Sequence, residues 1–566
     1  MPDTSYIQVL LPLRLEWDPY YSLPEGLQVQ PGARVRVLFA GRLYTGVVSA
    51  TGVTPPRELL PRVLPIREIR EDLPPVAPSE LRFWQALAAY YLCSVGEVYK
   101  AACPAVQNKV PKRPRPLKTA QTAPQEAPPR LTSAQQSALE GIRAGFSAGK
   151  TVLLHGVTGS GKTELYLALA QEYLQKGKSV LYLVPEIAVS RQLEQRIAGR
   201  FPDVLLYHSE VTDARRRKVA KTIREADAYL VLGTRSALLL PHRNLGLVIV
   251  DEEQDCSYKQ DAPAPRYHAR EAAIMLSGMQ DAHVLLGSAT PSLESLYNAE
   301  RGVFTKVNLK ERFRPGGNVR IEIVNVNAEQ KKLGMLGNFS KKLIALMQEV
   351  LSAGEQVLLL APRSLLSGDP PLSDELAALF PGQTHRILLG SAFSGSLRGP
   401  HTAGLVAVLG ADAILSRQDF RADERAFQLL EQFRGLSDHL GVLAIQTREA
   451  GHPVFQRLLH GQDATERLLQ ERLACHLPPY TRLVDVCIKD SSDKRGNYQA
   501  DQLARTLLAT PELAACVLGR QRDLIRLALP RDQHLRPRKQ LLAQLVTAHE
   551  KRNHYDGHIV LDVDPV

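Results

Sequence analysis

A phosphate-binding loop is the clearest chemical signal in this chain. The segment GVTGSGKT satisfies the full G-x-x-x-x-G-K-T pattern and lies between a strand pattern, TVLLH, and a helical one, ELYLALAQEYL. Glycines at these positions let backbone N–H groups curl around phosphates at a helix N-terminus. We expect Lys162 to reach the β and γ phosphates and Thr163 to ligate Mg²⁺. The residues expected to bind Mg–ATP are Gly156, Thr158, Gly159, Ser160, Gly161, Lys162 and Thr163.

Acidic residues follow a second apolar run, in LVIVDEEQ. Asp251 ends the predicted strand, where its carboxylate would hold the magnesium shell, and Glu252 is the candidate catalytic residue that would polarise water. The alternative is an acidic surface turn after a strand. Gln135, in LTSAQQSAL ahead of the phosphate loop, is the candidate contact for adenine. The segment GSATPS, 287–292, ends another strand and resembles the segment by which helicase-like motors couple nucleotide to DNA.

The elements around these residues predict a multidomain α/β protein. Apolar strands alternate with helices from 131 to about 310 and again from about 320 to 450, which is typical of parallel sheets wrapped by helices. Short strands in the N-terminal part predict a small β-barrel or sandwich. From Ser79 the period predicts a helix that Gly96 breaks and a second short helix after it, which form either a winged-helix module or part of a helical bundle.

Shifts in composition and periodicity give the domain boundaries. The predicted units are a β domain at 1–75, a winged-helix-like module at 76–108, a proline-rich basic linker at 109–130, a first lobe at 131–310, a second lobe at 311–450 and an α+β domain at 451–566. A chain of 566 residues is too long for one hydrophobic core, in agreement with this division.

Charge and cysteine content narrow the class of partner. The chain has 70 basic and 59 acidic residues, a net charge of +11, which favours polyanions such as nucleic acid; a merely basic soluble enzyme is the alternative. No run of 18 uncharged apolar residues is present, so we expect no membrane span. Six cysteines, none in a C-x-x-C pair, fit a reducing compartment and predict a cytoplasmic protein.

Five segments in order carry a resemblance to a known family: GVTGSGKTELYL, LVPEIAVSRQ, GTRSALLLP, DEEQDCSYKQ and GSATPSLES. With LPEGLQVQPGARVRVLF and VLDVDP near the two ends, they resemble the PriA family of replication restart proteins, of the superfamily 2 helicase class. The resemblance implies two RecA-like lobes, an N-terminal domain that binds the 3′ end of a leading strand, and winged-helix and C-terminal domains that grip duplex arms. It implies a nucleoid-associated protein whose partners are forked DNA, single-stranded DNA 3′ ends, the single-stranded DNA-binding protein, and the replicative helicase or its loader.

The same resemblance suggests DNA contacts. The candidates are Tyr20, Tyr21, Arg34, Arg36, Tyr258 and Tyr267. The family usually has F-D-Y before L-L-P-E-G, whereas this chain has Pro19, Tyr20 and Tyr21, so Asp18 could only partly replace the acidic contact of the 3′-end pocket. Ala264 and Pro265 lie where the family usually has a tryptophan, which predicts weaker stacking on bases.

The second lobe departs from the family pattern. The family has two zinc-binding clusters of C-x-x-C pairs there, but no cysteine lies between Cys256 and Cys475, so we expect no structural zinc. LGSAFSGSLRGPHTAG replaces G-T-Q-M-x-x-K-G, the family segment that contacts DNA and nucleotide. In the register fixed by DFRADERAFQLL, Leu436 and His439 occupy the two arginine positions of Q-V-A-G-R-A-G-R, and Arg434 lies two residues early.

These observations predict a fork-binding restart protein that promotes primosome assembly and replicative helicase reloading, with an intact ATP site but without helicase activity. An arginine on transition-state charge contributes about 10³- to 10⁵-fold in rate, so losing both arginines leaves little turnover. The alternative is an ATP-dependent 3′–5′ DNA helicase that acts at forks. A P-loop kinase or transport ATPase is disfavoured by GSATPS and by the basic N-terminal modules.

Overall fold

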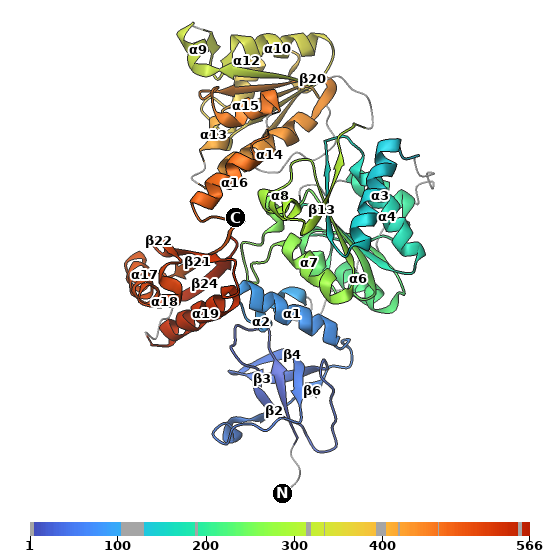
Figure 1. Cartoon of the computed structure of the whole chain (residues 1–566), viewed down its shortest axis with the longest axis vertical. Helices are drawn as coiled ribbons and strands as arrows, with labels where there is room; N and C mark the ends of the chain where they lie inside the picture. The colour runs from blue at the N-terminus through green and yellow to red at the C-terminus, as the bar shows by residue number, and fades with distance from the viewer. Residues whose placement is uncertain are drawn as a thin grey trace.

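The computed structural model describes residues 5–103, 130–186, 191–312, 319–332, 334–391, 403–416, 419–461, 463–552 and 557–565. The N-terminal β domain lies at one end and the second lobe at the other, with the first lobe and the C-terminal domain between them (Figure 1). The predicted linker 109–130 lies outside these segments except for Arg130. No helix in the described segments is long and apolar enough to cross a membrane.

The N-terminal domain is a sheet in the order β5-β2-β1-β4-β3-β6. Its strands are β1 (Tyr6–Leu10), β2 (Tyr20–Ser22), β3 (Arg34–Phe39), β4 (Arg42–Thr51), β5 (Leu64–Pro65) and β6 (Glu68–Ile69). The core between its strands buries Ile7, Val9, Val35 and Val37, which alternate along β1 and β3. The β3–β4 hairpin turns at Gly41, whose φ of 76° favours glycine.

Two helices, α1 (Pro78–Tyr91) and α2 (Val95–Ala102), pack on this sheet (Figure 1). The first ends at Leu92, which is left-handed (φ 54°), and not at Gly96 as predicted. Gly96 lies in the first turn of α2, where a Cβ atom would come within 2.3 Å of the Leu11 carbonyl oxygen, so glycine permits close packing there. The described residues from 76 to 103 contain these two helices and no strand, so by themselves they do not form a winged helix.

The first lobe has a seven-stranded parallel sheet in the order β13-β7-β12-β11-β8-β10-β9, as the alternation predicts. The strands are β7 (Thr151–Gly156), β8 (Ser179–Leu183), β9 (Leu205–Tyr207), β10 (Leu230–Gly233), β11 (Leu245–Asp251), β12 (His283–Ser288) and β13 (Phe304–Leu309). The helices are α3 (Ser133–Ser147), α4 (Lys162–Gln175), α5 (Arg191–Arg200), α6 (Asp213–Glu225), α7 (Ala269–Gln280) and α8 (Leu293–Glu300). The phosphate loop follows β7 and the acidic segment follows β11; both lie at the carboxyl edge because parallel strands end on the same side.

The second lobe has a five-stranded parallel sheet in the order β14-β20-β19-β17-β18. Its strands are β14 (Arg320–Asn325), β17 (Val357–Ala361), β18 (Ile387–Ser391), β19 (Ala403–Val408) and β20 (Ser437–Thr447), with a hairpin of β15 (Met335–Leu336) and β16 (Phe339–Ser340). Its helices are α9 (Val326–Lys331), α10 (Lys341–Ser352), α11 (Arg363–Leu366), α12 (Leu372–Leu379), α13 (Asp412–Leu415), α14 (Ala422–Gly435) and α15 (Pro453–His460). Phe455 of α15 is buried in the core of this lobe, so the lobe continues past residue 450.

The C-terminal domain is an antiparallel sheet, β22-β23-β21-β24, covered by helices. Its elements are α16 (Thr465–Ala474), β21 (Thr481–Lys489), α17 (Asp493–Leu508), α18 (Pro511–Ala514), β22 (Val517–Gln521), β23 (Leu524–Pro530), α19 (Leu535–Arg552) and β24 (His558–Val563). One continuous cluster of buried side chains runs from Trp84 of α1 through Val250 of the first lobe to Val484 of this domain. The three units therefore share apolar contacts.

Candidate nucleotide-binding site

The phosphate loop connects β7 to α4, which begins at Lys162. Gly159 and Gly161 have positive φ (76° and 82°), and a Cβ atom on Gly159 would meet nothing within 4 Å, so the space beside the loop, here called the phosphate cradle, is open at Gly159. Lys162 Nζ donates to the Gly156 carbonyl oxygen at 2.9 Å. Ser160 Oγ is buried without a hydrogen-bond partner among the described residues. A polyphosphate fits this arrangement because its oxygens would accept from both groups.

Two tyrosines hold the carboxylate of Asp251 at the end of β11. Tyr166 of α4 donates to Oδ1 at 3.0 Å, and Tyr182 of β8 donates to Oδ2 at 3.3 Å. Burial raises the pKa of Asp251, and the charge of Lys162 opposes that rise. Asp251 and Thr163, in the first turn of α4, are the residues that would hold Mg²⁺ beside the phosphates.

Gly287, in the GSATPS segment, packs directly against the hydroxyl of Tyr166. A Cβ atom at Gly287 would lie 1.7 Å from Tyr166 Oη, so any larger residue would displace the hydroxyl. Tyr258 adds a third contact by donating to the Asp251 carbonyl oxygen at 2.6 Å. Three tyrosines of the first lobe thus fix Asp251, two through its carboxylate and one through its main-chain carbonyl oxygen.

Glu252 lies beside the phosphate loop in a strained conformation. Its φ is 47°, which is uncommon for a residue with a side chain and is typical of functional sites. A carboxylate oxygen of Glu252 lies 4.0 Å from Lys162 Nζ, and Gln254 Nε2 donates to the other at 2.8 Å. Burial, followed by the neighbouring charge of Asp251, raises the pKa of Glu252.

A chain of hydrogen bonds leads from Glu252 to the second lobe. Gln254 Oε1 accepts from Ser288 Oγ at 2.6 Å, and Ser288 Oγ accepts from the Thr290 amide at 2.9 Å. The Thr290 carbonyl oxygen accepts from Gln428 Nε2 of α14 at 3.3 Å. Glu252 is therefore connected through GSATPS to the helix that precedes Leu436.

The predicted adenine contact, Gln135, has a different role in this structure. Its Oε1 accepts from the Thr132 amide at 3.0 Å and its Nε2 donates to the Ser160 carbonyl oxygen at 3.1 Å, and the residue is buried. The side chain closes a T-x-x-Q capping box at the start of α3 and supports the phosphate loop from behind. Both ends of the amide are occupied, so Gln135 does not present a free edge to a base.

The second lobe reaches the phosphate loop at the end of α14. A Cβ atom on Gly435 would lie 2.7 Å from Thr158 Cγ2, so the two lobes are in close contact there. Leu436 packs against the core of the second lobe, and Arg434 pairs with Glu431 of its own helix at 3.2 Å. The side chain of His439 and residues 392–402, most of the segment that replaces the family motif, lie outside the described part of the chain.

Two of the predicted DNA contacts in the N-terminal domain are core residues. Tyr21 is 2 % exposed, its hydroxyl donates to the Leu38 carbonyl oxygen at 3.1 Å, and burial raises its pKa to about 12. Arg34 is 4 % exposed, donates to the Pro74 carbonyl oxygen at 3.3 Å and lies over the ring of Tyr99. Neither side chain can reach DNA in this fold, which corrects the prediction.

Tyr258 and Tyr267 are likewise buried and cannot stack on bases as predicted, because their hydroxyls donate to backbone carbonyls within the first lobe. Tyr20 and Arg36 remain accessible. Arg36 lies 3.7 Å from Glu68, and the Arg36 side chain is 43 % exposed, so it stays available to phosphates. These two residues are the surviving candidates for DNA contact.

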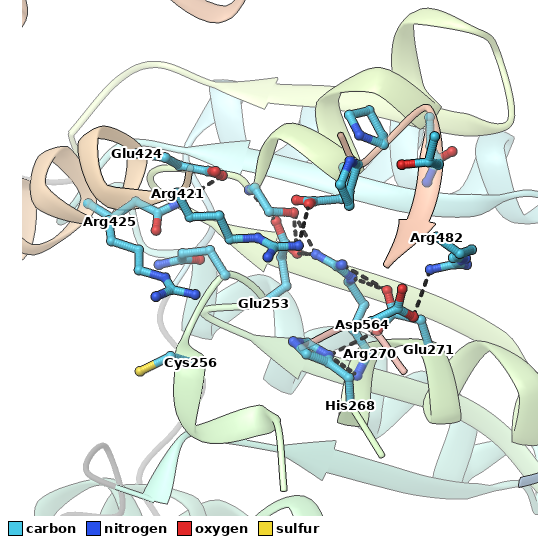
Figure 2. Close-up of a pocket in the computed structure, with 18 of the residues that line it drawn as sticks. Glu253, Cys256, His268, Arg270, Glu271, Arg421, Glu424, Arg425, Arg482 and Asp564 are labelled. Carbon is cyan, nitrogen blue, oxygen red and sulfur yellow. Dashed lines mark hydrogen bonds and ion pairs between the residues drawn. The ribbon is translucent and has the colours of Figure 1, made fainter. Parts of the chain in front are cut away.

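Charged side chains from three domains meet at a small cavity of about 90 Å³ (Figure 2). Arg270 pairs with Glu253 and Glu271, each at 2.7 Å, and Glu253 also accepts from the Ser292 amide at 2.7 Å. A cavity of this size has room for a few waters and not for a nucleotide. The junction is structural and separate from the phosphate cradle.

Ion pairs across this junction tie the second lobe to the first. Glu294 of α8 pairs with Arg421 at 3.0 Å and with Arg472 at 3.4 Å. Glu424 of α14 accepts from the Leu293 amide at 2.9 Å and pairs with Arg472. Sequence reasoning missed these residues, although charges within the DFRADERAFQLL helix are the signal that could have indicated them.

The end of β24 and the residues after it join four parts of the chain. Asp562 pairs with Lys259 at 2.8 Å and Arg266 at 3.0 Å, both in the first lobe. Asp564 pairs with Arg482 at 2.9 Å and accepts from the hydroxyl of Tyr90, in α1, at 3.2 Å. The carbonyl oxygen of residue 565 accepts from the Arg421 guanidinium, in the second lobe, at 3.0 Å. VLDVDP is therefore an interdomain contact.

Comparison with known families identifies two domains in this chain. Residues 132–299 match the DEAD/DEAH box helicase family, and residues 8–104 match the PriA 3′DNA-binding domain (3′BD), a unit that includes the sheet, α1 and α2. The structure of RecG bound to a three-way DNA junction has a TM-score of 0.41 at 18% identity and covers 61% of this chain and 47% of that one.

Relatives with the same name come from several bacteria. Replication restart protein PriA of Rickettsia felis is 28% identical over 86% of this chain and 88% of its own. PriA of Bacillus subtilis is 28% identical over 77% and 66%, and PriA of Haemophilus influenzae is 32% identical over 62% and 60%. With both domain matches in the expected order, this chain is similar to PriA replication restart proteins over most of its length.

Proposed function

We propose that this chain binds stalled or repaired replication forks through a 3′ DNA end and supports primosome assembly and reloading of the replicative helicase. The match of residues 8–104 to a 3′DNA-binding domain and the net charge of +11 support DNA as the partner. The single-stranded DNA-binding protein and the replicative helicase or its loader are the protein partners in this proposal, and they come from the family resemblance.

Substrate choice tests the DNA part of the proposal. Forks with a free 3′ leading end should bind more tightly than plain duplex at matched salt, and equal affinity would contradict fork recognition. Tyr20→Ala should weaken binding only of substrates with a reachable 3′ end, because Tyr20 is accessible in this domain whereas Tyr21 supports the core.

We further propose that Mg–ATP is bound without productive hydrolysis. The observation that carries this is the contact of Gly435 with Thr158, after which Leu436 turns into the core of the second lobe. The nearest arginine in sequence, Arg434, pairs with Glu431. An arginine finger contributes about 10³- to 10⁵-fold, or roughly 4 to 7 kcal/mol of barrier, so its loss slows chemistry while leaving binding to the first lobe.

ATP turnover with and without forked DNA tests this second part. We expect saturable Mg–ATP binding with turnover far below about 1 per second and no stimulation by forks. Fork-stimulated turnover at about 1 per second or faster would overturn the proposal. In that event the Arg434→Ala variant shows whether Arg434 is the arginine that stabilises the transition state, because its rate of hydrolysis would then fall strongly. Arg467→Ala is the control, since it removes an exposed arginine.

An ATP-dependent 3′–5′ helicase is the second candidate. The hydrogen-bond chain from Glu252 through Gln254, Ser288 and Thr290 to Gln428 favours it, because this chain would transmit a change at the nucleotide to the second lobe. Displacement of a labelled strand from a fork, dependent on ATP and abolished by Lys162→Ala, would select this candidate.

The second lobe is proposed to function without zinc. No cysteine lies between Cys256 and Cys475, and no group of three or more His, Cys, Asp or Glu in the described residues could hold a metal ion. Elemental analysis after dialysis should find less than one zinc per chain. One or two zinc ions per chain would contradict this expectation.

A further inference from the structure

Helix α6 (Asp213–Glu225) concentrates positive charge on the first lobe. Its basic residues are Arg215, Arg216, Arg217, Lys218, Lys221 and Arg224, and its acidic residues are Asp213 and Glu225. Six basic against two acidic residues give +4, more than a third of the net charge of +11 of the whole chain, within 13 residues. A surface of this density attracts polyanions.

The buried side of α6 fixes which charges face outward. Val219 and Ile223 are buried in the core that the first lobe shares with its neighbours. Arg216 folds back onto the lobe: it donates to the His208 carbonyl oxygen at 3.1 Å and lies over the ring of Tyr207 at 5.6 Å. The residues of α6 that remain exposed and basic are Arg215, Arg217, Lys218 and Lys221.

These exposed charges are only weakly neutralised within the protein. Lys221 lies 3.7 Å from Glu225, with the two side chains 73% and 65% exposed, and such surface pairs contribute little. Among the described residues, no carboxylate pairs with Arg215, Arg217 or Lys218. The outward side of α6 can therefore take up phosphates without first breaking a buried ion pair.

The last turn of α6 is fixed to the 3′DNA-binding domain. Arg224 pairs with Glu80 of α1 at 2.9 Å and donates to the Pro75 carbonyl oxygen at 3.1 Å. Glu80 is buried, so this contact holds α6 in a defined position beside residues 8–104. The basic helix α6 therefore lies directly beside the unit that matches a 3′DNA-binding domain.

We propose that α6 binds the phosphate backbone of the duplex arm whose 3′ end enters the N-terminal domain. The proposal rests on the fork binding proposed above and assigns one more surface to it. Arg217 and Lys221 are four residues apart, about 6 Å along the helix, while phosphates of one DNA strand follow each other by about 3.4 Å along the duplex axis. The exposed residues of α6 thus suit contact with two or three phosphates and carry no base specificity.

The test compares two triple variants of the full chain. R217A/K218A/K221A removes three charges from α6, and K331A/K332A/K341A removes three exposed lysines from the second lobe as the matched control. Affinity for a fork with a duplex leading arm and a free 3′ end is measured over a range of salt concentrations. The α6 variant should bind at least about tenfold more weakly, with the salt slope smaller by about 2 to 3, because each phosphate contact contributes about 0.9.

Three further outcomes decide the proposal. The control should keep the wild-type slope, R217K/K218R/K221R should retain fork affinity, and a single strand with the same 3′ end should bind all variants equally. An α6 variant with the wild-type slope, or a control that loses as much, would overturn it. If wild-type protein shows no preference for forks, the proposed function fails; if that preference persists and only the α6 variant is unchanged, this inference alone fails.

Discussion

At the residue scale, Lys162 decides whether the cradle holds a nucleotide. Its Nζ donates a hydrogen bond to the Gly156 carbonyl oxygen at 2.9 Å, and a bound phosphate oxygen would replace that acceptor. A ligand present at 100 times its dissociation constant adds about 2.7 kcal/mol to stability, so the melting temperature should rise with Mg–ATP. Lys162→Ala should abolish that rise while leaving the unliganded protein folded. A rise that survives in the variant, measured by thermal denaturation, would place the nucleotide elsewhere.

A second residue-scale prediction concerns Gly287. Gly287→Ala puts a Cβ atom 1.7 Å from Tyr166 Oη and must move a buried tyrosine that holds Asp251. Overpacking of this kind destabilises by about 1 to 3 kcal/mol, and the Mg–ATP-induced rise in melting temperature should shrink as well. Gly278→Ala is the control, because a Cβ atom there meets nothing within 4 Å in α7. It should be neutral or stabilise by about 0.4 to 1 kcal/mol in urea unfolding.

At the element scale, the segment after β10 contains a buried histidine that makes the first lobe sensitive to acid. Burial lowers the pKa of His242 to about 4, opposed by its hydrogen bond to the Ala237 carbonyl oxygen, whereas the unfolded chain keeps a value near 6.5. The unfolded state therefore takes up the proton first, and stability present above pH 6.5 is lost as pH falls toward 4.

Urea unfolding at two pH values tests this. Between pH 7 and pH 5 the histidine should account for about 2 kcal/mol of lost stability. His242→Gln retains a donor for the Ala237 carbonyl oxygen but does not titrate, so its loss over the same interval should be smaller by that amount. Equal losses in both proteins would show that other groups control the acid response.

The sequence predicts regular elements here better than it predicts exposure. The phosphate loop, its strand and its helix lie where the pattern places them, because these features depend on residues close in sequence. The family resemblance predicts that Tyr21 and Arg34 contact DNA, yet their hydrogen-bond partners Leu38 and Pro74 lie 17 and 40 residues away, and no local sequence pattern shows that both side chains are buried. Gln135 is a different case, because the T-x-x-Q pattern of a capping box is local in the sequence and indicates a structural role for its side chain.

At the scale of the whole molecule, Arg421 connects the two lobes to the end of the chain. It pairs with Glu294 at 3.0 Å and donates to the carbonyl oxygen of residue 565 at 3.0 Å. The two side chains are partly buried, 15% and 18% exposed, so removing one partner costs less than the roughly 3 to 5 kcal/mol of a fully buried pair. Arg421→Gln should therefore loosen the second lobe, seen as separate unfolding transitions and a larger radius of gyration in small-angle scattering.

Arg467→Gln is the control for this variant, because Arg467 pairs with Glu471 on the exposed side of α16. It should leave both measurements unchanged. A single transition and an unchanged radius in Arg421→Gln would mean that the remaining contacts of Glu294 and Glu424 suffice to hold the lobes together.

The contacts made by the end of β24 and the residues after it also have a consequence for the order of folding. The Tyr90–Asp564 hydrogen bond spans 474 residues and the Lys259–Val563 bond spans 304, so both close long loops at an entropy cost, and we expect them to form after the intervening units have folded. Docking of prefolded domains is slow compared with formation of a helix or hairpin. Until it occurs, apolar side chains of the cluster that runs from Trp84 to Val484 face water. We therefore expect refolding from denaturant to show a late phase in which this surface, and its tendency to aggregate, disappears.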